Sequence, residues 1–196
     1  DKEGNNGLDL CLNRQNTKTV KYLLSIGLEP SKPEYIFKLI TNSTYKECLK
    51  DLFSTNILKD NLNKISDDGT TILSTTYIFI RDMSLVKELL ELGADPTKDR
   101  LNAVYMSCLE NDIDACKLFI SYSDKTKLKD MLNDKDKSPW DIPIFVSITN
   151  NRVDIAKLLI ENGADINIKA KDRIDICEKE IAILIESKTK LELIKD

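Results

Sequence analysis

The chain has 196 residues, of which 41% are apolar, enough for a sizeable buried core and too many for a disordered protein. Its 29 basic and 33 acidic residues leave a net charge of −4, which gives no electrostatic reason to expect a nucleic-acid partner. No apolar run approaches the length that crosses a bilayer, so we expect no membrane insertion. The start, DKEGNNGLDL, lacks the basic and apolar regions of a signal peptide.

Three stretches along the chain share one pattern, an amphipathic helix followed by a glycine. They read TVKYLLSIGLEP from Thr19, SLVKELLELGADPTK from Ser84 and RVDIAKLLIENGADINIK from Arg152. Glycine suits the position just past a helix because that residue often takes positive φ. Self-similarity at a period of about 33 residues is typical of stacked-repeat proteins.

With these residues the chain resembles the ankyrin repeat family, whose unit is a β-turn, two short antiparallel helices and a second turn. The resemblance implies an all-α fold: an ankyrin-type solenoid of about five to six stacked helix-turn-helix repeats in a single domain spanning 1–196. The expected repeats span 1–32, 33–64, 65–98, 99–133 and 134–169, with a C-terminal cap over 170–196.

The first two repeats depart from the family pattern. Asn6-Gly7 replaces the family's Thr-Pro and Asp9 replaces its His, so we expect the first helix to start less firmly. The first repeat is also apolar where a terminal cap should be polar, which predicts a capping segment upstream. In the second repeat, Ser54-Thr55-Asn56 stands where Gly-Ala-Asp should follow, and ILKDNLNKI leaves room for an extra turn of helix.

The third repeat opens with DDGTTIL at Asp67, and the linker between its helices, 80–84, is one residue longer than usual. In the fourth repeat we expect helices over 103–110 and 113–122, with Asn111 left-handed between them. There SYSDKTKLKDMLNDKD replaces the Gly-Ala-Asp turn, so we expect an extra segment near 121–135. The helical spacing of its apolar residues predicts a short extra helix or a longer second helix.

The fifth repeat is the best formed. The sequence Asp141-Ile142-Pro143-Ile144 stands where the family has Thr-Pro-Leu, with a one-residue insertion. Beyond it, 171–196 alternates apolar and charged residues, as a half-polar terminal unit should.

Five cysteines are spread through predicted helices, and none belongs to a CxxC pair. They are Cys11, Cys48, Cys108, Cys116 and Cys177. We interpret them as buried structural thiols in preference to disulfides or a zinc site. This usage fits a reducing compartment, so we expect a cytoplasmic protein, and delivery into a host cytosol is compatible with it.

Residues that carry catalytic chemistry are missing. The chain has no histidine, which removes every imidazole-based acid–base scheme, and it has no phosphate-binding glycine loop. Carboxylate pairs such as Asp67-Asp68 are typical of repeat turns. We therefore expect no enzyme, no cofactor and no metal site. A cation bound by carboxylates is the weakest alternative.

The resemblance implies recognition through the concave face and the turn tips, where side chains form a ribbon open to a partner. The residues expected there are Asp67, Asp68, Thr70, Arg100, Asn102, Tyr105, Lys137, Trp140, Phe145 and Asn150. Trp140 is the sharpest candidate because tryptophan is common in binding hot spots. Alternatively it folds over 125–132 and closes a small satellite core. Tyr105 and Arg100 belong to a hot spot only if they face outward.

The sequence therefore favours a non-catalytic, monomeric protein–protein interaction module whose partner is a protein. The alternative is the recognition domain of a larger protein, or of a secreted or viral effector, whose activity lies outside these residues.

Overall fold

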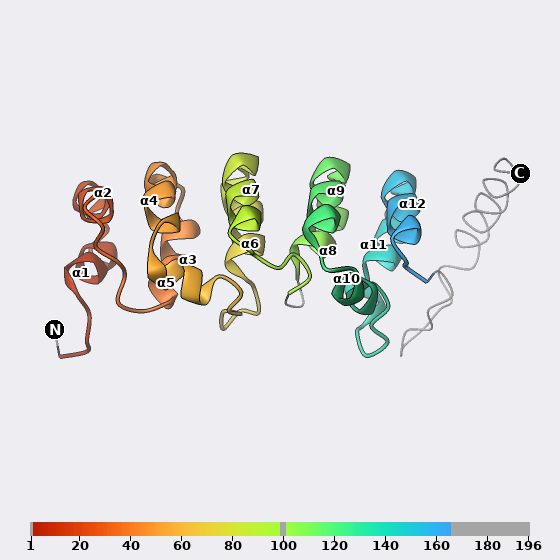
Figure 1. Ribbon diagram of the computed structural model, residues 1–196, viewed down its shortest axis with the longest axis horizontal. Coiled ribbons are helices and arrows are strands. Elements are labelled where there is room, and N and C mark those ends of the chain that lie inside the picture. Colours follow the sequence, from red (N-terminus) through yellow and green to blue (C-terminus); the bar gives the residue numbers. More distant parts are fainter. Residues whose placement is uncertain (1, 99–100, 166–196) are drawn as a thin grey trace, which may run out of the picture. The chain divides into compact units, whose positions relative to one another are not determined.

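The computed structural model describes residues 2–98 and 101–165 (Figure 1). Within these ranges the regular structure is entirely helical, which confirms the all-α prediction. The chain divides into two compact units, one ending at Asn102 and the other beginning at Ala103. The expected terminal cap, 170–196, lies outside the described residues, as do Arg100 and Cys177.

The first unit is built from pairs of short helices. They are α1 (Gly7–Asn13), α2 (Thr17–Ser25), α3 (Glu34–Ile40), the 3-10 helix η1 (Ser43–Cys48), α4 (Leu49–Phe53), α5 (Asn56–Asn61), α6 (Ile72–Thr75), the π-helical η2 (Thr76–Ile80) and α7 (Met83–Glu91). The first helices α1, α3 and α6 pack on one another in order, and the second helices α2, α4 and α7 do the same. Each pair therefore finds its packing partner in the next pair.

The core of the first unit lies between these two rows. Ile36 and Leu39 on α3 and Leu52 on α4 are fully buried. Complete burial of such a side chain contributes about 1.5–3 kcal/mol. Because a five- to nine-residue helix has little stability alone, packing between pairs stabilises this unit more than helix propensity does.

The start of α1 differs from the sequence-based expectation. Asn6 caps the helix by accepting from the backbone N–H groups of Leu8 and Asp9, and the Asp9 carboxylate accepts from the Asn6 N–H at 2.8 Å. Asp9 is fully buried, and it also accepts from the backbone N–H and the hydroxyl of Ser31. The expectation of a loosely fixed start is wrong, because the Asn–Asp pair supplies a hydrogen-bond network of its own.

Two irregularities of the first unit match the sequence. Helix α5 forms the extra turn expected near the end of the second repeat, with Leu58 buried. The extra residue near 80–84 corresponds to the π-helical η2, which ends at Arg81 in the left-handed region (φ 53°). A π-helical turn accommodates one additional residue without breaking the helix.

The second unit follows the predicted boundaries closely. It contains α8 (Ala103–Glu110), α9 (Ile113–Tyr122), α10 (Lys125–Leu132), the 3-10 helix η3 (Pro139–Asp141), α11 (Pro143–Thr149) and α12 (Val153–Glu161). Helix α8 packs on α11 and α9 on α12. The left-handed residue between α8 and α9 is Asn111 (φ 60°), as predicted, and Gly163 has φ 97° just after α12.

Helix α10 is the extra helix expected in the fourth repeat. Its apolar residues Leu128, Met131 and Leu132 are buried, and Asp124 caps it by accepting from the N–H groups of Thr126 and Lys127. The apolar spacing that predicted this helix therefore corresponds to its buried face.

Both extra helices are followed by an asparagine that holds the next turn. Asn63, after α5, donates to the Gly93 carbonyl at 3.1 Å and accepts from the Asp95 N–H at 2.7 Å. Asn133, after α10, makes the same two bonds to the Gly163 carbonyl (2.9 Å) and the Asp165 N–H (2.7 Å). We call these two pairs of bonds the asparagine clamps.

Three of the cysteines lie in the core, as the sequence indicated. Cys48, Cys108 and Cys116 are buried thiols, whereas Cys11 is only partly buried. Burial raises the pKa of Cys48 to about 11. The Cys108 and Cys116 sulfurs lie 3.9 Å apart, and their hydrogen bond, together with burial, raises the pKa of Cys108. Cys48 and Cys108 are therefore poor nucleophiles at neutral pH.

The asparagine clamp of the first unit can be tested by substitution. Asn63→Ala removes two hydrogen bonds between successive repeats, so the free energy of unfolding should fall by about 1–2 kcal/mol. Asn61→Ala is the control, because the Asn61 amide bonds only within α5, to the Ile57 carbonyl. Urea denaturation of both variants measures the difference. If both variants lower the free energy of unfolding equally, the clamp does not stabilise the fold.

A second test concerns Asp82, which caps α7. Hydrogen bonds from Ser84 and an ion pair with Lys46 at 3.0 Å lower the pKa of Asp82 to about 2. Because this pKa lies below the ordinary value of 3.8, the ionised carboxylate stabilises the fold above about pH 4. That contribution is lost as the pH falls towards 2.

We therefore expect Asp82→Asn to lower the free energy of unfolding by about 1 kcal/mol at pH 7, and the difference from the wild type to vanish near pH 2. Lys46→Met should have a smaller effect, because the Ser84 hydrogen bond is the larger cause of the shift. Denaturant titrations between pH 2 and pH 7 measure both. A difference that stays constant over this range would refute the assignment.

Candidate interaction surface

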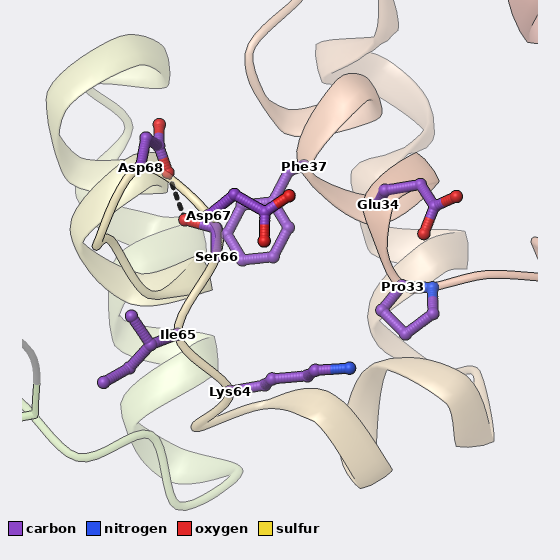
Figure 2. A pocket seen from close by; sticks show the side chains of 8 residues that line it. All are labelled: Pro33, Glu34, Phe37, Lys64, Ile65, Ser66, Asp67 and Asp68. Atoms are coloured by element: carbon purple, nitrogen blue, oxygen red, sulfur yellow. Dashed lines mark hydrogen bonds between the residues drawn. The ribbon is translucent and has the colours of Figure 1, made fainter.

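A groove opens in the first unit between the start of α3 and the loop that leads to α6. It encloses a cavity of about 320 Å³ (Figure 2). Its lining residues are Pro33, Glu34 and Phe37 on one side and Lys64, Ile65, Ser66, Asp67 and Asp68 on the other. The two sides belong to successive repeats, so stacking creates the groove.

Ser66 fixes the loop that forms one wall. Its backbone N–H donates to the Thr70 carbonyl at 2.8 Å, and its hydroxyl bonds to the same carbonyl at 2.9 Å. The Ser66 hydroxyl also donates to the Asp68 carboxylate, which accepts from the Thr70 hydroxyl at 3.2 Å as well. These bonds lower the pKa of Asp68, with Ser66 as the largest cause. Gly69 turns the chain with φ 82°.

The groove combines apolar surface with carboxylates. Phe37 is half-buried, and Ile65 is 43% exposed. Glu34 and Asp67 are exposed, and neither carboxylate has a hydrogen-bond or ion-pair partner within the part of the chain that the structure describes. Lys64 is the one basic residue among the lining side chains. The groove thus offers acidic groups that the fold itself does not use.

The structure brings three of the expected contact residues together here. Asp67 and Asp68 line the groove, and the Thr70 hydroxyl bonds to Asp68 and lies 3.0 Å from the Thr75 hydroxyl. Asp68 and Thr70 thus hold the loop in shape, which leaves Asp67 as the aspartate whose carboxylate is open to a ligand.

Three other expected contact residues lie in the interior. Asn102 is fully buried, and Tyr105 and Phe145 are 6% and 5% exposed. Tyr105 donates its hydroxyl to the Trp140 carbonyl at 2.8 Å, which orders the chain before α11. Tyr105 and Phe145 each occupy the third position of a first helix, where the side chain is buried by packing. The condition that Tyr105 face outward is therefore not met.

Trp140 lies on the surface of the second unit. Its side chain is 58% exposed, so it does not close a satellite core over 125–132. Its hydrogen bond with Tyr105 is made by the backbone carbonyl, not by the indole. In the same unit Asn150 is exposed and Lys137 is partly exposed. Asn150 donates to the Val146 carbonyl at 2.8 Å within its own helix.

Sequence reasoning missed most of the groove. Pro33, Glu34, Phe37, Lys64 and Ile65 line it but were not expected there. One signal was present in α3. Tyr35, Ile36, Leu39 and Ile40 form its buried face, which leaves Phe37 to point elsewhere.

The residues that the structure describes include no group of three or more Cys, Asp or Glu placed to hold a metal ion. Among the same residues, no helix is long and apolar enough to cross a membrane.

The hydrogen bond from Ser66 predicts how substitutions change the pKa of Asp68. Ser66→Ala removes the largest cause of the lowered pKa, so the pKa of Asp68 should rise towards its ordinary value. Thr70→Val removes a lesser cause and should raise it less. Carbon-detected NMR titration of the aspartate carboxyls measures both shifts. An unchanged Asp68 pKa in Ser66→Ala would show that Ser66 does not organise this loop.

Comparison with known proteins agrees with this architecture. Residues 77–170 match the family model for ankyrin repeats, described as three copies. The comparison with curated proteins gave no match. The match spans α7 to α12, where helix pairs alternate with glycine turns at Gly93 and Gly163. The segment 77–170 is thus similar to ankyrin repeats, which is consistent with the ankyrin repeat family.

Proposed function

We propose that this protein is a non-catalytic interaction module that binds a partner protein through the concave face and turn tips of its repeats. Ankyrin repeats are generally protein–protein interaction modules. The observation that carries the proposal is the groove, because Glu34, Asp67 and Ile65 are exposed there without a role in the fold. Exposed apolar surface beside unused charge favours a partner that supplies the complementary groups.

The proposed contacts in the second unit centre on Trp140. An indole that is 58% exposed can bury a large area against a partner at low entropic cost. Lys137 and Asn150 provide polar groups in the same unit. Asn102, Tyr105 and Phe145 are left out of the proposed surface because they are buried.

A protein partner fits the chemistry of the chain better than other ligands. Ankyrin repeat domains are generally non-catalytic, and the chain has no histidine for acid–base chemistry. The net charge of −4 disfavours nucleic acid. We propose that the protein acts as a monomer in a reducing cytosol, since its thiols are free wherever they are described.

The proposal is tested by comparing two exposed aromatic residues of the second unit. Trp140→Ala should weaken partner binding by at least about 2 kcal/mol with little loss of stability, because the bond from Tyr105 goes to the backbone of residue 140. Tyr122→Ala is the matched control. Tyr122 is 40% exposed, but it lies on the second helix of its pair, α9, where we expect no partner contact.

Cytosolic proteins captured by the wild type and by Tyr122→Ala, but not by Trp140→Ala, identify the partner, and calorimetry with that partner measures the loss. Thermal unfolding of each variant checks stability. If Trp140→Ala captures the same proteins with the same affinity, Trp140 is not part of the interface. If it unfolds far below the wild type, Trp140 belongs to the fold.

A further inference from the structure

We propose that the groove between α3 and the 64–68 loop is a receptor for an arginine side chain on an extended segment of the partner protein. This inference rests on the proposed function and specifies the chemistry of the partner at this one site. Four features of the groove support it: its size, its apolar wall, its charge and the freedom of its carboxylates.

The size of the cavity suits a single long side chain. Ligand pockets for small molecules run from about 300 to 1,000 Å³, so a cavity of about 320 Å³ lies at the lower limit. The groove is therefore too small for a large cofactor. Its volume is on the scale of one long side chain.

The apolar wall suits an aliphatic stem and a flat cation. Pro33, the half-buried Phe37 and the 43% exposed Ile65 all line the cavity. The methylene groups of arginine gain free energy by covering such surface while the charged head stays near water. A guanidinium is planar and can stack on an aromatic ring. A lysine ammonium is not planar and cannot stack in this way. Phe37 offers such a ring.

The charge of the groove determines the sign of its ligand. Glu34, Asp67 and Asp68 set three carboxylates against the single ammonium of Lys64. The amino end of α3 adds roughly half a positive charge, which does not offset the carboxylate excess. An anionic group would thus be repelled, and a cationic one attracted.

The carboxylates are also free to bind. Within the described residues, the Glu34 and Asp67 side chains accept no hydrogen bond and form no ion pair. Figure 2 shows them on opposite sides of the groove, Glu34 at the start of α3 and Asp67 on the loop. The five N–H donors of a guanidinium can serve two such carboxylates at once, whereas a single anchor would satisfy only one.

The test uses N-acetyl-arginine methylamide as the probe and the neutral N-acetyl-citrulline methylamide as its near-isosteric control. Each is titrated into the isotope-labelled whole chain, and NMR follows the Phe37 ring and the Ile65 methyl groups. We expect the arginine probe to shift these signals with saturation, and the citrulline probe to bind at least about tenfold more weakly. That factor corresponds to the loss of two exposed ion pairs.

A charge-matched pair of variants locates the effect. Glu34→Gln with Asp67→Asn should weaken arginine binding about tenfold, whereas Asp51→Asn with Glu91→Gln should leave it unchanged. Asp51 and Glu91 are exposed acidic residues of the same unit, on the second helices α4 and α7, outside the groove. Both pairs change the net charge equally. Any general electrostatic attraction therefore cancels in the comparison.

Three results would overturn the inference: no shift at Phe37 and Ile65, equal binding of arginine and citrulline probes, or equal weakening by the two variant pairs. The Trp140-dependent capture of a partner is independent of all three. If a partner is captured but the groove does not bind the arginine probe, the interaction function stands and the assignment of the groove fails. If the groove binds the arginine probe but no partner is captured, the groove's preference for a guanidinium stands, whereas the assignment of its occupant to a partner protein fails.

Discussion

The described structure depends on packing between successive helix pairs, because a single pair cannot bury its own apolar surface. Within 2–98 and 101–165 the α-helices run from four to ten residues, too short to persist alone in water. When two helices are joined by a tight turn, their contact with each other covers only part of their apolar surface. The rest must pack against neighbouring pairs. In the first unit α3 and α4 meet neighbours on both sides, and those contacts bury Ile36, Leu39 and Leu52.

Because the chain has no histidine, other residues must hold the first helix of each repeat in place. The third residue of each first helix, where the family has histidine, is replaced by a different chemical solution at each site. Asp9 accepts hydrogen bonds from Asn6 before α1 and from Ser31 beyond α2, Ser74 completes a capping box with Thr71, and Tyr105 donates to the Trp140 carbonyl. Phe145 packs in the core instead. Asp9 and Ser74 thus fix the start of their own helices, whereas Tyr105 bonds to the segment before α11 and Phe145 fills the core.

Prediction from sequence succeeded where the signal was local. The helices over 103–110 and 113–122, the left-handed Asn111 and the extra helix α10 all follow from periodicity and turn chemistry within a few residues. It failed where two distant segments meet. The burial of Tyr105 depends on the next repeat, and the groove requires 33–37 to lie beside 64–68. The spacing of apolar residues along a helix does not indicate which of its sides the next repeat will cover.

The asparagine clamps have a consequence for how such a chain can change its length. In each unit the asparagine lies 30 residues before its glycine and 32 before its aspartate, and both extra helices precede it. Asn63 and Asn133 are thus as far apart as Gly93 and Gly163. Each clamp joins the segment after an extra helix to the glycine turn of the following repeat. An insertion or deletion between the asparagine and its glycine would therefore move the two partners out of hydrogen-bond reach.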